Sequence, residues 1–163
     1  MLTKKAEEKA LFKEVSALVE SLGLSLVEVS QDKEKGCTNM RVVLAREEGD
    51  INTEDLEKAY NVIYPMYQVI CENRDLNLEV SSPGMQRSFK DYYEFKVFRN
   101  RNVRVYSTLY SSYVVGRIGE CGENSVVLYD YTIEDKKEQG ESMAMDFDTI
   151  AKAKLECIWE EKK

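Results

Sequence analysis

The most informative absence in this chain of 163 residues is histidine, of which it has none. Without an imidazole, a chain cannot build a serine–histidine or cysteine–histidine nucleophile pair, a histidine-ligated metal site or a proton switch near neutral pH. Chemistry that relies on carboxylates or lysine stays open. Triad-type hydrolysis is therefore excluded.

Paired cysteines and long apolar runs are missing as well. The four cysteines form no CxxC pair, so we expect reduced thiols and neither a thiolate metal cluster nor a redox pair: Cys37, Cys71, Cys121 and Cys157. No window approaches eighteen consecutive apolar residues, and the N-terminal residues mix charges where a signal segment would be apolar. The sequence predicts a cytoplasmic protein with no membrane span.

The charge balance is acidic. The chain has 23 basic and 30 acidic residues, a net charge of −7, and 43% hydrophobic residues, which suits one ordinary domain or two small ones. Because phosphate repels an acidic surface, broad binding to nucleic acid is disfavoured, whereas a local basic patch or a basic protein partner is compatible. When the chain is divided after Lys90, the two parts carry −4 and −3 (12 basic and 16 acidic residues, then 11 and 14).

Helical and strand patterns alternate in residues 1–90. An apolar stripe predicts a helix over about 3–22, ended by Gly23: Leu11, Val15, Leu18, Val19 and Leu22. Residues 24–30 and 38–45 have the composition of a hairpin with a charged, glycine-containing turn. We expect a third strand over 75–80, with the apolar side chains on one face and Asn77 and Glu79 on the other.

A second helix is predicted before that third strand, with Asn52 or Thr53 as its N-cap. Its apolar stripe consists of Leu56, Tyr60, Ile63, Tyr67 and Ile70. Pro65 interrupts the stripe and predicts a kink or an early stop near Tyr64. The order helix–strand–strand–helix–strand indicates an α+β domain of two layers, residues 1–90, in which two helices cover one face of a three-stranded sheet.

The pattern changes after Lys90. Residues 91–98 suggest a short helix or turn anchored by Phe95 and Phe98, and five short strand-like segments follow. Such a run of short strands without a long helix is typical of a small SH3- or Sm-like barrel, which we expect over 91–163. Gly116 and Gly119 fit the bends that such a barrel needs.

A Ser-Ser-Pro-Gly segment follows the third predicted strand. Proline fixes φ at about −65° and glycine accepts the positive φ of a type II turn, so residues 82–85 can turn by backbone chemistry alone. Several polar side chains are expected at this exposed corner: Glu79, Ser81, Ser82, Gln86 and Arg87. We interpret it as a corner with an interface role, because without GxSxG and histidine the serines are not nucleophiles.

A basic run begins the second half of the chain. Residues 96–104 hold four cations and no acidic residue: Lys96, Arg99, Arg101 and Arg104. With aromatic residues close by, this run can contact a few phosphates, and Arg117 would join it if the strands pair. The alternative is a solvated strand whose arginines lay their aliphatic stems on the protein surface. The ten tyrosines likewise fit either base stacking or ordinary packing with a wet hydroxyl.

The segment LEVSSPGMQRSF, residues 78–89, resembles the motif of the ribosome maturation factor RimP family, in which LEVSSPG is followed by Leu-Asp-Arg-Pro-Leu. The chain keeps residues 78–84 and Arg87, and it differs at Met85, Gln86, Ser88 and Phe89. Weaker resemblances are NRNVRV (100–105), VVGRIGE (114–120) and FDTIAKAKL (147–155), which match strands of the family's barrel.

The resemblance implies a binding protein that assists late assembly of the small (30S) ribosomal subunit. Members of the family have an α+β domain followed by an SH3/Sm-like barrel, bind the immature subunit and help to install the strongly basic ribosomal protein number twelve. They are not enzymes and need no cofactor or metal, and an acidic chain suits a basic client.

On this basis we expect a cytoplasmic monomer whose partners are ribosomal RNA of the small subunit and a basic ribosomal protein. The candidate partner-binding residues are Glu79, Ser81, Ser82, Pro83, Gly84, Arg87, Lys96, Arg99, Arg101 and Arg104. Two other functions stay open. The chain can be an Sm-like module for small RNA, or an enzyme that uses carboxylates such as Glu79, which would require a pocket with paired acids.

Overall fold

The computed structural model describes Leu2 and residues 9–34, 36–46, 51–71, 75–84 and 86–156. The chain divides into two compact units, which we call the N-terminal unit (residues 5–83) and the C-terminal unit (residues 84–163, with residues 1–4). Parts of the expected elements lie outside the described residues, namely 3–8 of the first helix, 47–50 of the loop before the second, Met85 of the turn and the end of the last strand beyond Glu156.

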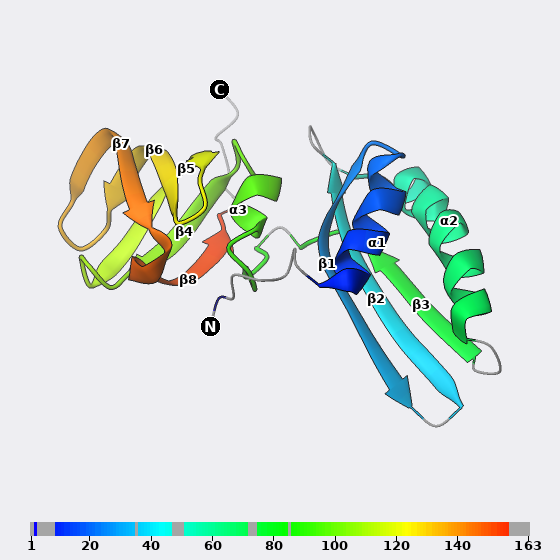
Figure 1. The fold of residues 1–163 in the computed structure, drawn as a ribbon. Coiled ribbons are helices and arrows are strands. Elements are labelled where there is room, and N and C mark those ends of the chain that lie inside the picture. The colour runs from blue at the N-terminus through cyan, green and yellow to red at the C-terminus, as the bar shows by residue number, and fades with distance from the viewer. Residues whose placement is uncertain are drawn as a thin grey trace. The chain divides into compact units, whose positions relative to one another are not determined.

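The N-terminal unit has the predicted order of helices and strands (Figure 1). Its elements are α1 (Ala10–Glu20), β1 (Leu24–Glu34), β2 (Cys37–Arg46), α2 (Thr53–Cys71) and β3 (Asp75–Ser81). β1 and β2 are antiparallel, and β3 pairs parallel to β2 after the crossover through α2, so β3 is an edge strand. The mixed α+β class is confirmed for this unit.

α1 buries only part of the predicted apolar stripe, because Leu11, Leu18 and Leu22 are half-buried and Phe12 takes a core position. Phe12, Val15 and Val19, spaced three and four residues apart, face the sheet and are at most 5% exposed. The helix ends where Gly23 adopts a left-handed φ of 78°, and the Gly23 N–H donates to the Glu20 carbonyl over 3.0 Å. Glycine accepts this conformation without a steric cost, which explains the stop.

α2 departs from the prediction at two residues. The early stop near Tyr64 is wrong, because the helix runs through Pro65 to Cys71. A proline removes one backbone hydrogen bond, and the burial of Ile63 and Tyr67 on either side of it holds the helix against the sheet. The placement of Tyr60 in the core is also wrong: it is 37% exposed, and Ala59 takes its position in the buried stripe.

The N-terminus of α2 is capped as the sequence suggests. The Asp55 N–H donates to the Asn52 side-chain oxygen over 2.8 Å, and the Asn52 N–H donates to the Asp55 carboxylate over 3.1 Å. This reciprocal pair satisfies two backbone donors that a free helix end leaves open. Asn52, and not Thr53, is therefore the N-cap.

The C-terminal unit contains the short helix and the five strands that the sequence predicts (Figure 1). They are α3 (Glu94–Val97), β4 (Asn102–Ser107), β5 (Ser112–Cys121), β6 (Ser125–Ile133), β7 (Glu138–Asp146) and β8 (Ile150–Leu155). All strand pairs are antiparallel and the order is β7-β6-β5-β4-β8. Because no pairing joins β7 to β8 among the described residues, the closed barrel is not confirmed.

An aromatic cluster fills the space between α3 and β8. Phe95 and Phe98 are buried as expected, and Phe89 stacks on Phe98 and meets Phe95 edge-on. The Tyr92 hydroxyl donates to the carbonyl oxygen of Phe147 over 2.8 Å, and the Tyr92 ring stacks on the Phe147 ring. These contacts attach residues 89–98 to the chain segment that leads into β8.

β5 bends at the two glycines that the sequence singles out. Its pairing with β6 shifts register between Val115 and Arg117 and again between Ile118 and Cys121, so Gly116 and Gly119 lie in the irregular steps. A Cβ atom added at Gly119 would overlap the ring of Tyr129. The absent side chain therefore makes room for an aromatic ring across the strand pair.

Replacing Gly119 with alanine tests this close approach. We expect Gly119→Ala to lower the free energy of unfolding by about 1–3 kcal/mol, because the Tyr129 ring must leave its place. In a Tyr129→Ala background the cost should largely disappear. Gly122→Ala is the control, since its Cβ would meet no atom closer than 3.8 Å. Urea denaturation of the four variants provides the values, and an equal cost in both backgrounds would contradict the explanation.

Candidate partner-binding surfaces

The Ser-Ser-Pro-Gly segment lies where one unit ends and the other begins, between Pro83 and Gly84. The expected type II turn over residues 82–85 is wrong, because the φ of Gly84 lies outside the left-handed region that this turn requires. The turn bond is found further on, where the Arg87 N–H donates to the Gly84 carbonyl over 3.2 Å. The chain thus turns into the C-terminal unit after the motif's glycine.

Residues 87–89 continue this path in extended form beside β8, joined to it by an isolated β-bridge. The Leu155 N–H donates to the Arg87 carbonyl over 2.9 Å, and the Phe89 N–H donates to the Ala153 carbonyl over 2.8 Å. Ser88 bridges to Lys154 between these two bonds. Since β4 pairs with the other side of β8, the end of the motif covers an otherwise open strand edge.

Arg87 was expected at the surface, and this expectation is wrong. Its side chain is 7% exposed and forms a bidentate ion pair with Glu94, which is 1% exposed. The Arg87 Nε donates to one carboxylate oxygen over 2.6 Å, and Nη2 donates to the other over 3.0 Å. The Lys90 N–H donates to the same carboxylate over 2.9 Å. Because the pair is buried, removal of either partner would leave a charge without its counterion. The pair also holds α3 to residues 87–89.

The other polar residues of the motif belong to the N-terminal unit. Glu79 is exposed and pairs with Arg41, its register partner on β2, over 3.4 Å. Ser81 ends β3 half-buried, Ser82 is exposed and Pro83 is half-buried. The polar set expected at one corner is therefore divided between two units, with Glu79, Ser81, Ser82 and Pro83 in one and Gly84, Gln86 and Arg87 in the other.

The basic run meets acidic partners that a local sequence window does not contain. Arg99 lies 3.4 Å from Glu120, and Arg104 lies 2.7 Å from Glu134, whose hydrogen bond raises the pKa of the guanidinium. Lys96 and Arg101 are exposed, and the Arg101 guanidinium lies 6.0 Å from the centre of the Phe98 ring. The folded chain thus brings carboxylates beside two of the four cations of this run.

Arg104 nevertheless forms part of a basic and aromatic surface on the C-terminal unit. Its guanidinium lies 4.0 Å from the centre of the Tyr113 ring, and the ring of Tyr106 meets Tyr113 edge-on at 5.1 Å. On β8, Lys154 is opposite Arg104 and Lys152 is opposite Tyr106. These lysines are far from Arg104 in the sequence, and only the pairing of β4 with β8 places them beside it. A cavity of about 280 Å³ is lined in part by Arg104, Tyr113, Lys152 and Lys154.

Arg117 extends this surface in the way the sequence allows. It pairs across the strands with Asn102 of β4, lies 5.2 Å from the centre of the Tyr129 ring and contacts Asp130 over 3.5 Å. Like Arg99 and Arg104, it is a cation with a solvent-exposed acidic partner. Such exposed pairs contribute little free energy and exchange readily with other anions.

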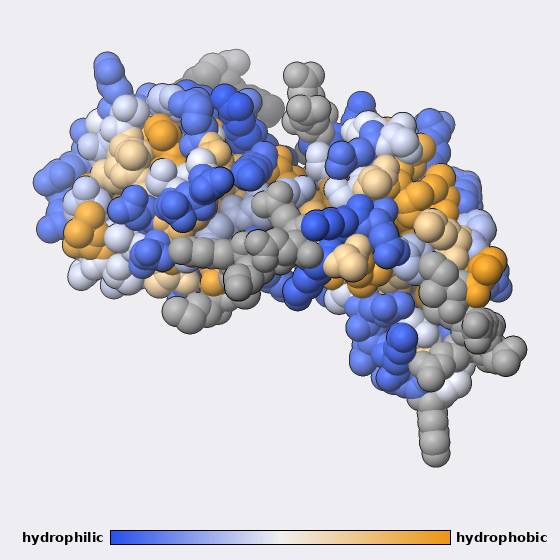
Figure 2. Space-filling model, viewed as in Figure 1, coloured by the Kyte–Doolittle hydropathy of each residue, from blue (hydrophilic) through white to orange (hydrophobic). Residues whose placement is uncertain are grey.

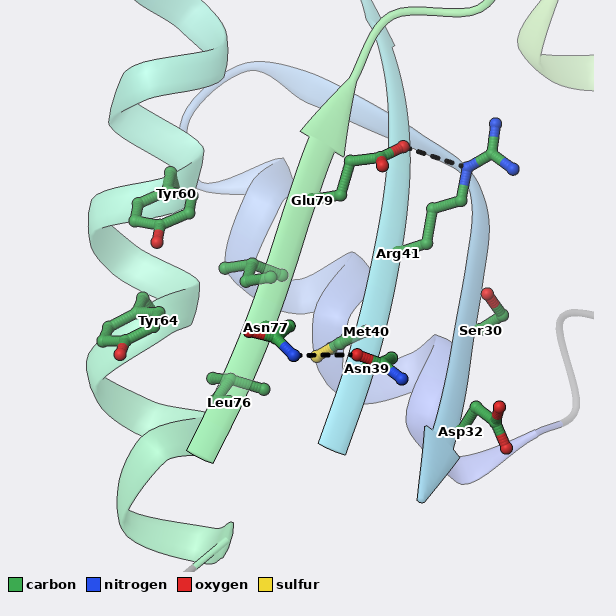
Figure 3. Close-up of a pocket in the computed structure, with 11 residues that line it drawn as sticks. Ser30, Asp32, Asn39, Met40, Arg41, Tyr60, Tyr64, Leu76, Asn77 and Glu79 are labelled. Carbon is green, nitrogen blue, oxygen red and sulfur yellow. Dashed lines mark hydrogen bonds and ion pairs between the residues drawn. The ribbon is translucent and has the colours of Figure 1, made fainter. Parts of the chain in front are cut away.

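A second cavity, of about 540 Å³, lies beside the edge strand of the N-terminal unit (Figure 3). We call it the β3 cleft. Its lining consists of Ser30, Asp32, Asn39, Met40, Arg41, Tyr60, Tyr64, Leu76, Asn77, Leu78 and Glu79. Sequence reasoning missed this cleft. The available signal was the placement of Tyr60 and Tyr64 four residues apart, which puts both rings on one side of a helix.

The described part of α2 also exposes an apolar stripe. Val62, Met66 and Val69 follow the i, i+4, i+7 spacing of one helix face, and Figure 2 shows hydrophobic side chains at the surface over α2. On a helix of 3.6 residues per turn, this stripe and the Tyr60–Tyr64 pair lie on opposite flanks of the buried face. The stripe is therefore separate from the β3 cleft.

The negative charge is distributed unevenly between the two units. Residues 5–83 contain 9 basic and 16 acidic residues, whereas the rest of the chain contains 14 of each. The net charge of −7 therefore belongs to the N-terminal unit, and the C-terminal unit is neutral. The even distribution expected from a division after Lys90 hides this asymmetry, because Lys4, Arg87 and Lys90 belong with the C-terminal unit.

Residues 14–86 match the family model of the RimP N-terminal domain. The chain therefore contains a RimP N-terminal domain. The match begins within α1 and includes β1, β2, α2, β3 and the Ser-Ser-Pro-Gly segment, so it covers nearly the whole N-terminal unit. RimP proteins form a family of ribosome maturation factors.

Two further observations concern the described residues of the chain. None of their helices is long and apolar enough to cross a membrane. They also contain no group of three or more cysteine, aspartate or glutamate side chains that could hold a metal ion.

The buried ion pair makes a sharp prediction about stability. We expect Arg87→Ala to lower the free energy of unfolding by about 3–5 kcal/mol, because Glu94 would keep a buried charge without its counterion. Arg87→Met combined with Glu94→Met should cost clearly less. Urea denaturation measures both, and Arg41→Ala, which breaks the exposed pair with Glu79, is the control expected to change little. A similar small effect for Arg87→Ala would contradict the structural role.

Proposed function

We propose that this RimP-family chain assists assembly of the small (30S) ribosomal subunit by binding the immature subunit together with a basic small-subunit ribosomal protein. The observation that carries the proposal is the match of residues 14–86 to the RimP N-terminal domain. The chain acts in the cytoplasm as a monomeric binding protein, not as an enzyme, and it needs no cofactor.

The charge of the N-terminal unit supports the protein-binding half of this proposal. A net charge of −7 confined to residues 5–83 attracts a basic client and repels ribosomal RNA. Complementary charge raises the encounter rate and suppresses wrong partners more than it raises affinity. Glu79, Ser81, Ser82 and Pro83 lie in this unit and remain candidate contacts.

The C-terminal unit supports the RNA-binding half. We assign it an SH3/Sm-like barrel fold, in which Lys96, Arg99, Arg101 and Arg104 contact phosphates of ribosomal RNA. The acidic partners of Arg99 and Arg104 do not preclude this, since exposed ion pairs are weak and a phosphate can displace a carboxylate. Gly84 and Arg87 act by fixing the segment that enters this unit.

A second candidate function is an Sm-like module that binds small RNA without the ribosome. The observation that favours it is the neutral C-terminal unit with its Arg104–Tyr113 stack, since cations and aromatic rings together bind single strands. A gel shift with short single-stranded RNAs separates the two functions. Tight binding to isolated strands, without binding to subunits, would favour the second.

Co-sedimentation tests the main proposal directly. We expect the full chain to sediment with free small subunits and to be nearly absent from the large-subunit fraction and from assembled ribosomes. Large subunits serve as the control for non-specific association with ribosomal RNA. If the chain stays in the supernatant with small subunits at low and moderate salt, the proposal is wrong.

The phosphate contacts predict a change in salt dependence. Arg99→Glu combined with Arg101→Glu should weaken binding to small subunits and reduce the slope of log K against log salt by about 2, because two phosphate contacts are lost. Lys136→Glu combined with Lys137→Glu makes the same charge change in an exposed turn of the same unit and is the matched control. An unchanged slope in the arginine variant would rule out these contacts.

A further inference from the structure

The β3 cleft combines a free strand edge with side chains suited to cations. β3 pairs only with β2 among the described residues, so its other edge presents backbone N–H and carbonyl groups. In Figure 3, β3 lies between β2 and α2, and the rings of Tyr60 and Tyr64 stand on the α2 side. The free edge of β3 therefore runs along the side of the cleft that the two tyrosines border.

The side chains of the cleft are arranged in three kinds of groups. Tyr60 and Tyr64 stack on each other at 5.4 Å between ring centres, which fixes two aromatic faces side by side. Asn77 donates to Asn39 over 3.0 Å, and the pair offers further amide donors and acceptors. Asp32 and Glu79 supply two carboxylates against the single cation Arg41.

The charges decide what kind of chain the cleft accepts. Two carboxylates against one guanidinium, within a unit of net charge −7, disfavour a phosphate backbone and favour a cationic ligand. Aromatic faces attract ammonium and guanidinium groups. The Arg41–Glu79 pair is 54% and 67% exposed on its two sides, so an incoming cation can share the carboxylate.

We propose that the β3 cleft binds an extended lysine- and arginine-rich segment of a protein partner. The segment adds as a strand to the free edge of β3, and alternate cationic side chains lie on Tyr60 and Tyr64 and beside Glu79. Main-chain hydrogen bonds hold the segment, while the side-chain contacts select basic residues. This deepens the proposed function by assigning a site to the basic client, and it rests on that function for the client's ribosomal origin.

The test measures binding of a defined probe to the full chain. The probe is a fluorescent peptide of about twelve residues in which lysine or arginine alternates with threonine or valine, followed by fluorescence anisotropy. Tyr60→Ala combined with Tyr64→Ala should weaken binding by about tenfold through lost cation–π contacts. Val62→Ala combined with Val69→Ala, on the other flank of α2, is the matched control and should leave binding unchanged.

Charge and backbone are tested separately. Glu79→Lys should weaken binding of the peptide, while Glu20→Lys, the same change at the end of α1, should have little effect on that binding. A peptide with N-methyl groups on alternate amides should lose binding in the one register that pairs with β3. Equal binding of the wild type and the tyrosine variant, or equal binding of both methylated registers, overturns the proposal. Preference for an acidic peptide or a short single-stranded RNA overturns it as well.

Failure of this site and failure of the proposed function give different results. If the Tyr60→Ala/Tyr64→Ala variant loses the peptide and also binds small subunits more weakly, both proposals stand together. If the wild-type chain sediments with small subunits but the peptide does not bind in the cleft, only the cleft proposal is wrong. If the peptide binds in the cleft but the chain does not sediment with small subunits, only the proposed function is wrong.

Discussion

The buried ion pair between Arg87 and Glu94 is the constraint on which the C-terminal unit depends. A guanidinium that is 7% exposed requires a carboxylate in one position, and that carboxylate lies on α3. The pair thereby fixes residues 87–89 against β8, and these residues cover the edge of the sheet. The aromatic cluster of Phe89, Phe95 and Phe98 then packs around a segment whose position is already set.

The boundary between the units gives the Ser-Ser-Pro-Gly motif its meaning. Strand β3 ends at Ser81, the first unit ends at Pro83, and the chain enters the second unit at Gly84. The motif thus ends one sheet and begins the path to another. This connecting role explains the motif without a catalytic role for its serines. Its arginine is a structural residue of the second unit, whereas its glutamate is an exposed residue of the first.

The two units differ in their chemical surfaces, and the proposed function rests on this difference. The acidic unit, with its open strand edge and stacked tyrosines, suits cationic protein segments. The neutral unit, with arginines that share exposed carboxylates and lie on tyrosine rings, suits phosphates and bases. A chain that binds a basic protein and an RNA needs this separation, because one mixed surface would attract neither strongly.

Local pattern was enough to predict the order of the elements, the α+β class of the N-terminal unit and the irregular steps of β5, because glycines and periodicity act within a few residues. It restricted the N-cap of α2 to Asn52 or Thr53, and the hydrogen bonds of the folded chain select Asn52. The LEVSSPG motif likewise identified the family, since it is a property of the sequence itself. Tertiary structure decided the rest. Pairing between distant strands placed Glu120 and Glu134 beside the basic run, burial turned Arg87 inward, and the fold of α2 against β3 created the cleft. The contacts of Glu120 and Glu134 and the lining of the cleft join residues far apart in the chain, so no local window contains both partners. Glu94 lies only seven residues after Arg87, and it is the surrounding fold that buries their pair.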